Sequence, residues 1–348
     1  MVGAGRMGSI HANAYKRNPK ADLIAVCDVE QARADNLAVT IGARSYASLS
    51  ELLELEQPDV VSICTDASYH REAVLAALDA GAHVLCEKPM SGYLHDIEVM
   101  MEKANQRGRR LGANFNHRFA RVAQKAKEHI SLGHVGEICF VHMWLTIAVA
   151  SEVSDYFHLR SLHGHSFDML RYLAGDIAEV HGFLSKSSGR KYFSNCSIGC
   201  RFESGGVGAI VGSYEMSNLH PMERVEVGGT KGRLVLDNVT AGLTFYRHDK
   251  EEFEAWVPVN YTRHAGQTEY DFNRTVEHRI DAFLHSILRN EEDAAPAQDA
   301  WAATRLIEAT IESFEEGRVV KLSGSEHANS RQAGVANDAG TAKGPSSV

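Results

Sequence analysis

A glycine motif at the start of the chain constrains the fold more than any other feature. The sequence opens MVGAGRMGSIH, in which Gly3, Gly5 and Gly8 have the G-x-G-x-x-G spacing of a turn that leads from a β-strand into a helix and carries a dinucleotide pyrophosphate. Such a turn follows the central strand of a parallel sheet, but only Met1 and Val2 precede it here. We therefore expect an N-terminus several residues short, with Val2 the last residue of a longer native strand. Without that strand we expect lower stability and weaker dinucleotide binding.

The first 117 residues alternate between short apolar runs and segments of helical periodicity. Segment 68–82, for example, repeats alanine and leucine at helical spacing and ends near a glycine. This alternation predicts an α/β domain over residues 1–117, with a doubly wound parallel sheet of the Rossmann type. The runs rich in β-branched residues cover 22–28, 59–65 and 83–89, and a last strand is expected over 109–116.

The pattern changes after residue 117. We predict an α+β domain over 118–322, with a large, mostly antiparallel sheet and helices on one face, because long strand-like segments follow one another across glycine-bearing turns. The small polar residues of 323–348 predict a disordered tail. The expected strands cover 136–150, 178–187, 192–203, 207–216, 223–230, 232–237 and 243–248, and the expected helices lie near 119–132, 161–175, 268–289 and 298–316.

Composition excludes several classes of protein. The formal net charge of −9 comes without a basic block, which argues against nucleic acid as a partner. No apolar run reaches the ~18 residues of a membrane span, and no secretory signal is visible, so we expect no membrane association and a cytoplasmic location. The six cysteines form no C-x-x-C pair and suit a reducing compartment.

We predict no metal site. Cys196 and Cys200 fall on the same face of one expected strand, but no third ligand is near them in the sequence. The spacing of His158, His163 and His165 matches no recognised zinc pattern.

The cofactor prediction depends on an acidic residue beyond the glycine motif. Asp28 lies 20 residues after Gly8, at the end of the next expected strand, where a carboxylate accepts hydrogen bonds from the hydroxyls of an adenosine ribose. Its charge would repel a 2′-phosphate, and Val29 and Glu30 supply no arginine to hold one, so NAD is favoured over NADP. A tight glycine turn with a simple strand-end aspartate is the alternative. The residues expected at the pyrophosphate are Gly3, Gly5, Arg6, Met7 and Gly8.

A second motif, CEKPM, ends the strand expected over 83–89. Ligands of open parallel sheets bind at the carboxyl ends of the strands, so Glu87 and Lys88 are expected at the nicotinamide crevice. Pro89 restricts the preceding residue to extended geometry and so fixes how Lys88 is presented. Alone, such a tripeptide would more often be a solvated loop.

Several motifs together resemble the Gfo/Idh/MocA family of nicotinamide-dependent sugar and polyol oxidoreductases. The segments GAGRMGSIHANAY, CTDASYHREAVLAALDAGAHVLCEKPM and GANFNHRF carry the resemblance in the first domain, and HSFDMLRYLAGD and VEVGGTKGRLVLDN carry it in the second. The resemblance extends from residue 2 to about 322. It implies that Lys88 is the catalytic or substrate-orienting lysine and that Thr65 and His70 line the cofactor site. Asp66 stands where the family usually has proline.

The resemblance also implies a general base, with one departure from the family pattern. Family members commonly have D-x-x-x-H on a helix, and His165 holds the histidine position while Ser161 replaces the aspartate. The family's second aspartate is kept as Asp168, and we expect Ser161, His165 and Asp168 to share one helix face. A serine cannot stabilise an imidazolium by charge, so Tyr156, His158 and His163 are candidates to supply part of that role. A histidine packed at the domain interface is the alternative for His165.

Residues after the last strand of the first domain complete the candidate site. Arg118 and His117 stand at the domain junction, where they either bind a substrate hydroxyl or carboxylate or hold the hinge. Asn116 is a candidate neighbour of the cofactor.

The expected function is hydride transfer between NAD and a secondary hydroxyl of a sugar, cyclic polyol or sugar derivative. Lys88 and His165 would handle the proton of that hydroxyl. Two alternatives stay open: a same-fold enzyme that recycles bound NAD for net epimerisation, elimination or hydration, and a non-catalytic dinucleotide-binding sensor. An uncovered face of the second sheet is expected to pair with a copy of itself, giving a homodimer or homotetramer.

Overall fold

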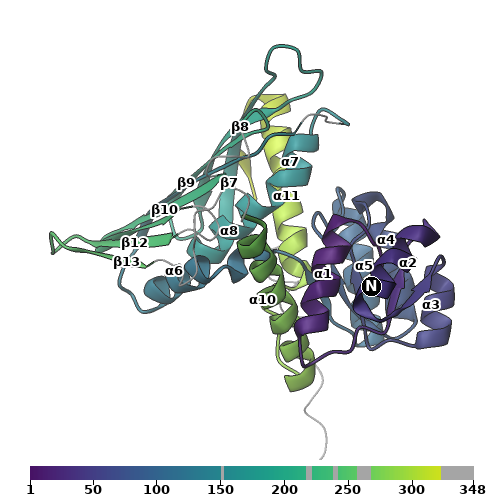
Figure 1. Ribbon diagram of the computed structural model, residues 1–348. Coiled ribbons are helices and arrows are strands. Elements are labelled where there is room, and N and C mark those ends of the chain that lie inside the picture. Colours follow the sequence, from purple (N-terminus) through teal and green to yellow (C-terminus); the bar gives the residue numbers. More distant parts are fainter. Residues whose placement is uncertain (150–152, 217–221, 238–241, 257–267, 323–348) are drawn as a thin grey trace, which may run out of the picture.

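The computed structural model describes residues 1–149, 153–216, 222–237, 242–256 and 268–322. A parallel-sheet domain with helices on both faces stands beside a large sheet, and the long helices α10 and α11 lie between the two (Figure 1). Among the described residues, no helix is long and apolar enough to cross a membrane. The predicted tail over 323–348 lies outside the described residues.

The first domain alternates strands and helices as the sequence predicts. Each predicted strand is present in a shorter form, and β2 and α3 are additional elements that the sequence did not reveal. The elements are α1 (Arg6–Arg17), β1 (Ala25–Cys27), α2 (Gln31–Ile41), β2 (Arg44–Tyr46), α3 (Leu49–Glu56), β3 (Val60–Ile63), α4 (His70–Asp79), β4 (His83–Cys86), α5 (Leu94–Arg107) and β5 (Leu111–Ala113).

Val2 joins two parts of the parallel sheet. The pairs β2–β1 and β3–β4–β5 are parallel, and Val2 forms parallel bridges to Cys27 of β1 and Ile63 of β3. The Val2 amide donates to the Ser62 carbonyl at 2.9 Å, and the Val2 carbonyl accepts from the Cys64 amide at 2.8 Å. Val2 therefore has the central position expected for the residue before the glycine turn.

The second domain is built on a nine-stranded sheet. Its strand order is β13-β12-β11-β10-β6-β9-β8-β7-β14, and every neighbouring pair is antiparallel except β6 and β9. This confirms the mostly antiparallel prediction. The strands are β6 (Ile138–Thr146), β7 (Ile177–Ser185), β8 (Asn195–Phe202), β9 (Val207–Ser213), β10 (Glu223–Gly229), β11 (Gly232–Asp237), β12 (Gly242–Arg247), β13 (Phe253–Trp256) and β14 (Val320–Lys321).

The helices of this domain cover one face of the sheet. They pack on this inner face through α11 on β7, α8 on β6, and α6 on β11 and β12. Figure 1 shows α6, α8 and α11 on the same side of the sheet. The alternating burial along β8 follows from this arrangement, because Cys196, Ile198, Cys200 and Phe202 point inward. The helices are α6 (Arg121–Ser131), α7 (Phe157–Leu162), α8 (Gly164–Ala174), α10 (Thr268–Arg289) and α11 (Ala297–Glu316).

The structure corrects one prediction about these helices. A single helix was expected over 161–175, but α7 ends at Leu162 and α8 begins at Gly164. His163 lies between them, and its backbone conformation is outside the helical region. It is the C-cap of α7 and the N-cap of α8. Ser161 and His165 therefore do not share one helix face.

A buried arginine ties α10 to the edge of the first domain. Arg279 is fully buried and makes two 2.7 Å hydrogen bonds to the Asp293 carboxylate. It also donates to the carbonyls of Ala113 in β5 and Ala295. Because the Arg279 guanidinium is hydrogen-bonded to groups of both domains, it holds α10 of the second domain against β5 of the first.

Candidate active site

The glycine loop combines a tight turn with open space. Gly3 has φ +91°, and a Cβ there would lie 2.7 Å from the Cys64 carbonyl oxygen, while a Cβ on Gly8 would lie 1.8 Å from the Gly3 oxygen. A Cβ on Gly5 would meet nothing within 4 Å. Gly5 also caps α1 without a side-chain bond, so the helix N-terminus keeps free amide donors in front of that space. This geometry fits a pyrophosphate.

Asp28 is held by the backbone around the same loop. Its Oδ2 accepts from the Ala4 amide at 2.8 Å and its Oδ1 from the Glu30 amide at 2.9 Å. The carboxylate thus stands at the end of β1, directly beside the glycine turn, as the ribose interpretation requires. Arg6 and Met7 begin α1, and the Arg6 guanidinium lies over the Phe272 ring at 5.8 Å.

His70 connects the loops after β3 and β4. Its Nε2 lies 3.0 Å from the Thr65 carbonyl oxygen, and its Nδ1 lies 3.0 Å from the Pro89 carbonyl oxygen. The Thr65 hydroxyl is buried without a hydrogen-bond partner. A buried hydroxyl without a partner beside the glycine loop suits a residue that lines the cofactor site and bonds to a ligand there.

Glu87 belongs to a closed polar network under the loops. Its Oε1 lies 3.0 Å from His11 Nε2 and accepts from Asn114 Nδ2 at 2.6 Å, while its Oε2 accepts from the Lys88 amide at 3.0 Å. Burial opposes ionisation of Glu87, but these partners and the Lys88 charge keep its pKa below the ordinary value. The network fixes the backbone from which Lys88 projects.

Lys88 points from the first domain toward the second. It follows β4, is joined to Pro89 by a cis peptide bond, and its Nζ donates to the Ser161 carbonyl at 3.2 Å. Burial lowers the pKa of Lys88, the Glu87 carboxylate partly restores it, and Arg6 lowers it further. An ammonium with a lowered pKa is suited to proton exchange with a substrate hydroxyl.

His165 lies in the first turn of α8, stacked on a second histidine. The rings of His165 and His117 are 3.8 Å apart and 9° from parallel, and His117 Nδ1 donates to Glu223 Oε2 at 2.7 Å. All three residues are buried. Burial lowers the pKa of His165 well below its usual value, and the charges of His117 and Lys88 lower it further. The ring is therefore neutral at pH 7 and able to accept a proton.

Glu223 is a site residue that sequence reasoning missed. It begins β10, which pairs with β6, and lies more than 100 residues from His117. A glutamate at the start of a strand carries no sequence signal for such a role. Glu223 thus places a buried carboxylate next to the stacked pair of His117 and His165.

Arg118 and Asp168 face each other at the domain junction. Arg118 forms a forked ion pair with the Asp168 carboxylate, and it also donates to Asp299 Oδ2 at 2.9 Å and to the Ala294 carbonyl at 2.7 Å. Burial raises the pKa of Asp168 to about 6, against the stabilising charge and hydrogen bonds of Arg118. These contacts favour the hinge interpretation of Arg118, because its donors are already occupied.

The remaining candidates lie at varying distances from this pair of histidines. Asn116 donates to the Thr275 hydroxyl at 2.6 Å and so links the first domain to α10. Tyr156 bonds to Glu315 and stacks on Phe193. His158 packs inward against His163 and Tyr214. Substrate contacts by Tyr156, His158 and Ser161 remain predictions.

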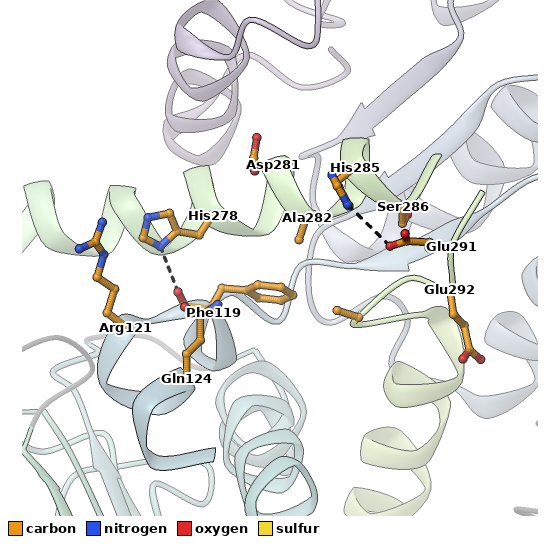
Figure 2. A pocket seen from close by; sticks show the side chains of 11 residues that line it. Phe119, Arg121, Gln124, His278, Asp281, Ala282, His285, Ser286, Glu291 and Glu292 are labelled. Carbon is orange, nitrogen blue, oxygen red and sulfur yellow. Dashed lines mark hydrogen bonds and ion pairs between the residues drawn. The ribbon is translucent and has the colours of Figure 1, made fainter. Parts of the chain in front are cut away.

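A hollow of about 550 Å³ lies elsewhere, along α10 (Figure 2). It is lined by Phe119, His278 and Glu291 among others, and His278 Nδ1 donates to the Phe119 carbonyl at 3.1 Å. It contains neither Lys88 nor His165. The candidate residues Lys88 and His165 therefore lie outside this hollow.

Comparisons with known proteins bear on the fold and on the dinucleotide-binding domain. Residues 1–115 match the family model described as an oxidoreductase family, NAD-binding Rossmann fold, and residues 158–322 match that family's C-terminal alpha/beta domain. Myo-inositol 2-dehydrogenase of Thermotoga maritima is 29% identical over 92% of this chain and 97% of its own length. Inositol 2-dehydrogenase of Rhizobium meliloti is 26% identical over 92% and 98%.

Solved structures show the same fold. A probable dehydrogenase from Thermotoga maritima has a TM-score of 0.79 at 28% identity, covering 92% of this chain and 97% of that one. An oxidoreductase from Agrobacterium radiobacter, solved with NAD⁺, L-tartaric acid and magnesium, has a TM-score of 0.85 at 20% identity, with 92% and 96% covered.

Proposed function

This chain belongs to the Gfo/Idh/MocA family of oxidoreductases, and from that premise we propose that it is an NAD-dependent dehydrogenase of a sugar or polyol. The observation that carries the proposal is that Lys88, from the dinucleotide-binding domain, reaches the Ser161 carbonyl of the second domain, four residues before His165 in the sequence. Two relatives that align along nearly the whole chain are named myo-inositol 2-dehydrogenase and inositol 2-dehydrogenase, which supports a secondary hydroxyl as the reacting group.

The first domain's residues fit NAD. The open space at Gly5 and the free amides of α1 would hold the pyrophosphate, and Asp28 would accept hydrogen bonds from the ribose hydroxyls. The charge of Asp28 favours NAD over NADP, since a 2′-phosphate would be repelled. When bound, NAD supplies the hydride acceptor or donor at its nicotinamide ring.

Lys88 and His165 have different roles when the substrate hydroxyl is oxidised. The neutral imidazole of His165 takes the hydroxyl proton, and the Lys88 ammonium stabilises the oxygen charge that develops on the substrate. In the reverse direction the same groups return the proton.

Glu223 acts through His117 as a positioning residue. Its carboxylate accepts a hydrogen bond from His117, whose ring lies flat on His165. The carboxylate fixes the orientation of the His117 ring and, through the stacking contact, the place of the His165 ring.

A panel of inositols, pyranoses and sugar acids with NAD⁺ or NADP⁺, scored by nicotinamide absorbance, tests this function. Accumulation of NADH with at least one polyol or sugar supports net dehydrogenation. Product without NADH would instead assign the chain to the cofactor-recycling enzymes. Binding of NAD with no conversion of any substrate would favour a sensor.

We further propose that the uncovered face of the nine-stranded sheet forms a homodimer or homotetramer interface. Phe140, Phe183, Val207 and Val211 are exposed on this face, where the described residues provide no covering helix. Exposed apolar sheet faces of this kind commonly pair with the same face of a second copy of the chain.

The six free cysteines support the expected cytoplasmic location.

A further inference from the structure

Three buried side chains converge behind α8. His158 comes from α7, His163 from the junction of α7 and α8, and Cys196 from the inner face of β8. The two Nε2 atoms are 3.2 Å apart, and Cys196 Sγ lies 3.4 Å from His163 Nε2. All three ligand atoms lie within 4.8 Å of one another, and all three residues are buried.

These separations suit ligands of one tetrahedral metal ion. Zinc binds histidine nitrogen at about 2.0–2.1 Å and cysteine sulfur at about 2.3 Å, which places neighbouring ligand atoms about 3.3–3.6 Å apart around a tetrahedron. The observed 3.2 and 3.4 Å fall close to that range. Two histidine nitrogens and one sulfur form a borderline-soft donor set, which zinc accepts and magnesium does not.

The surroundings prepare these atoms for coordination. His163 Nδ1 lies 2.9 Å from the Ser166 hydroxyl; when it donates there, Nε2 is left with its lone pair facing His158 and Cys196. A Cβ on Gly212 of β9 would lie 2.1 Å from His163 Nε2 and 2.9 Å from Cys196 Sγ. Glycine at position 212 therefore leaves space for the side chains of His163 and Cys196.

We propose that His158, His163 and Cys196 bind one Zn²⁺ ion. The Cys196 thiol loses its proton to solvent when the sulfur binds, and water occupies the fourth position. The ion would join the α7–α8 junction to β8 and so fix the start of the helix that carries His165. Zinc at this site would take the place of the substrate contact predicted for His158, and the metal content can be tested without reference to the proposed hydride transfer. This proposal replaces the sequence-based prediction of no metal site. The sequence did not indicate the cluster, because Cys196 lies more than 30 residues from both histidines along the chain.

Metal content of tag-free protein tests the proposal. We expect protein from zinc-supplemented cells to retain about one zinc per chain after dialysis, measured by atomic emission. Cys196→Ala should lose it. Cys200→Ala is the matched control, because Cys200 is also buried on the inner face of β8 but is not part of the cluster.

A cobalt spectrum covers the case in which the variant does not fold. Wild-type protein refolded with Co²⁺ should show a sulfur-to-cobalt charge-transfer band in the near ultraviolet and the intense visible bands of a tetrahedral site. Wild-type protein without bound zinc, zinc retained equally in Cys196→Ala, or a cobalt spectrum without the sulfur band would each overturn the proposal. Those results would leave a buried hydrogen-bonded cluster in which the Cys196 thiol donates to His163.

Discussion

At the residue scale, the candidate site is held by partners from both domains. Lys88 is fixed by the Glu87 network below it and by the Ser161 carbonyl across the junction. Among the described residues, no carboxylate bonds to His165, and the buried Nδ1 atom of its ring has no hydrogen-bond partner. Its environment is set instead by the stacked ring of His117 and by Glu223 behind that ring.

Replacing Glu223 with glutamine tests the positioning role. Loss of a charge-assisted hydrogen bond worth about 1.5–3 kcal/mol should lower kcat by about 10-fold or more, with KM for NAD unchanged. Glu226→Gln is the control, because Glu226 lies on the opposite face of β10 and pairs with Arg233. Steady-state kinetics of the two variants provide the measurement. Equal kcat values for both variants would remove Glu223 from the mechanism.

The alkaline limb of the pH profile tests the environment of Lys88. Burial favours the neutral amine, so the ammonium is lost as pH rises through a pKa below the usual 10.5. The Glu87 carboxylate raises that pKa, so Glu87→Gln should move the alkaline limb of kcat/KM to lower pH. Glu102→Gln, an exposed change on α5, should leave the profile in place. A shift to higher pH in Glu87→Gln would contradict this assignment.

At the element scale, local patterns in the sequence identified most strands of the first domain but missed β2 and α3, and they were insufficient for the site. The runs at 59–65 and 83–89 identify β3 and β4, because a parallel strand buried on both faces is continuously apolar. The helix break at His163 was not visible, since the segment keeps helical periodicity on both sides. Glu223 and Cys196 reach the histidines only through long-range strand pairing, which no local pattern records.

The contact between α10 and β5 predicts a large loss of stability on one substitution. Arg279→Met leaves the buried Asp293 carboxylate without its partner, which should cost about 3–5 kcal/mol and lower Tm by several degrees. Arg274→Met, on the exposed side of the same helix, should change stability by less than about 1 kcal/mol. Scanning calorimetry compares the two. Equal Tm values would show that the buried pair does not hold the domains together.

At the scale of the whole molecule, the two faces of the nine-stranded sheet have different surroundings. Its inner face supports α8, the helix that carries His165, while the helices among the described residues leave its outer face uncovered. The two domains meet along α10 and α11, so the site forms where the chain's two halves are held together. Association through the outer face would leave that junction unobstructed.

A charge placed on the outer face tests the association. Val211 is 41% exposed in the middle of β9, and Val211→Asp should shift the protein to a smaller species because a dimer would bury the new carboxylate. Val39→Asp, on a helix of the first domain, is the matched control. Light scattering after size exclusion gives the masses. A wild-type monomer, or a Val211→Asp mass equal to that of wild type in an oligomer, would refute this interface.

NADH accumulation by Lys88→Ala tests the central claim most directly. With the best polyol or sugar from the panel, removal of the lysine should lower turnover by about 10²–10⁴-fold, the range expected for a positioned acid-base group. Binding of NAD, measured by calorimetric titration, should remain nearly intact because the residues expected at its pyrophosphate and ribose are unchanged. Turnover by Lys88→Ala equal to that of wild type would contradict the account.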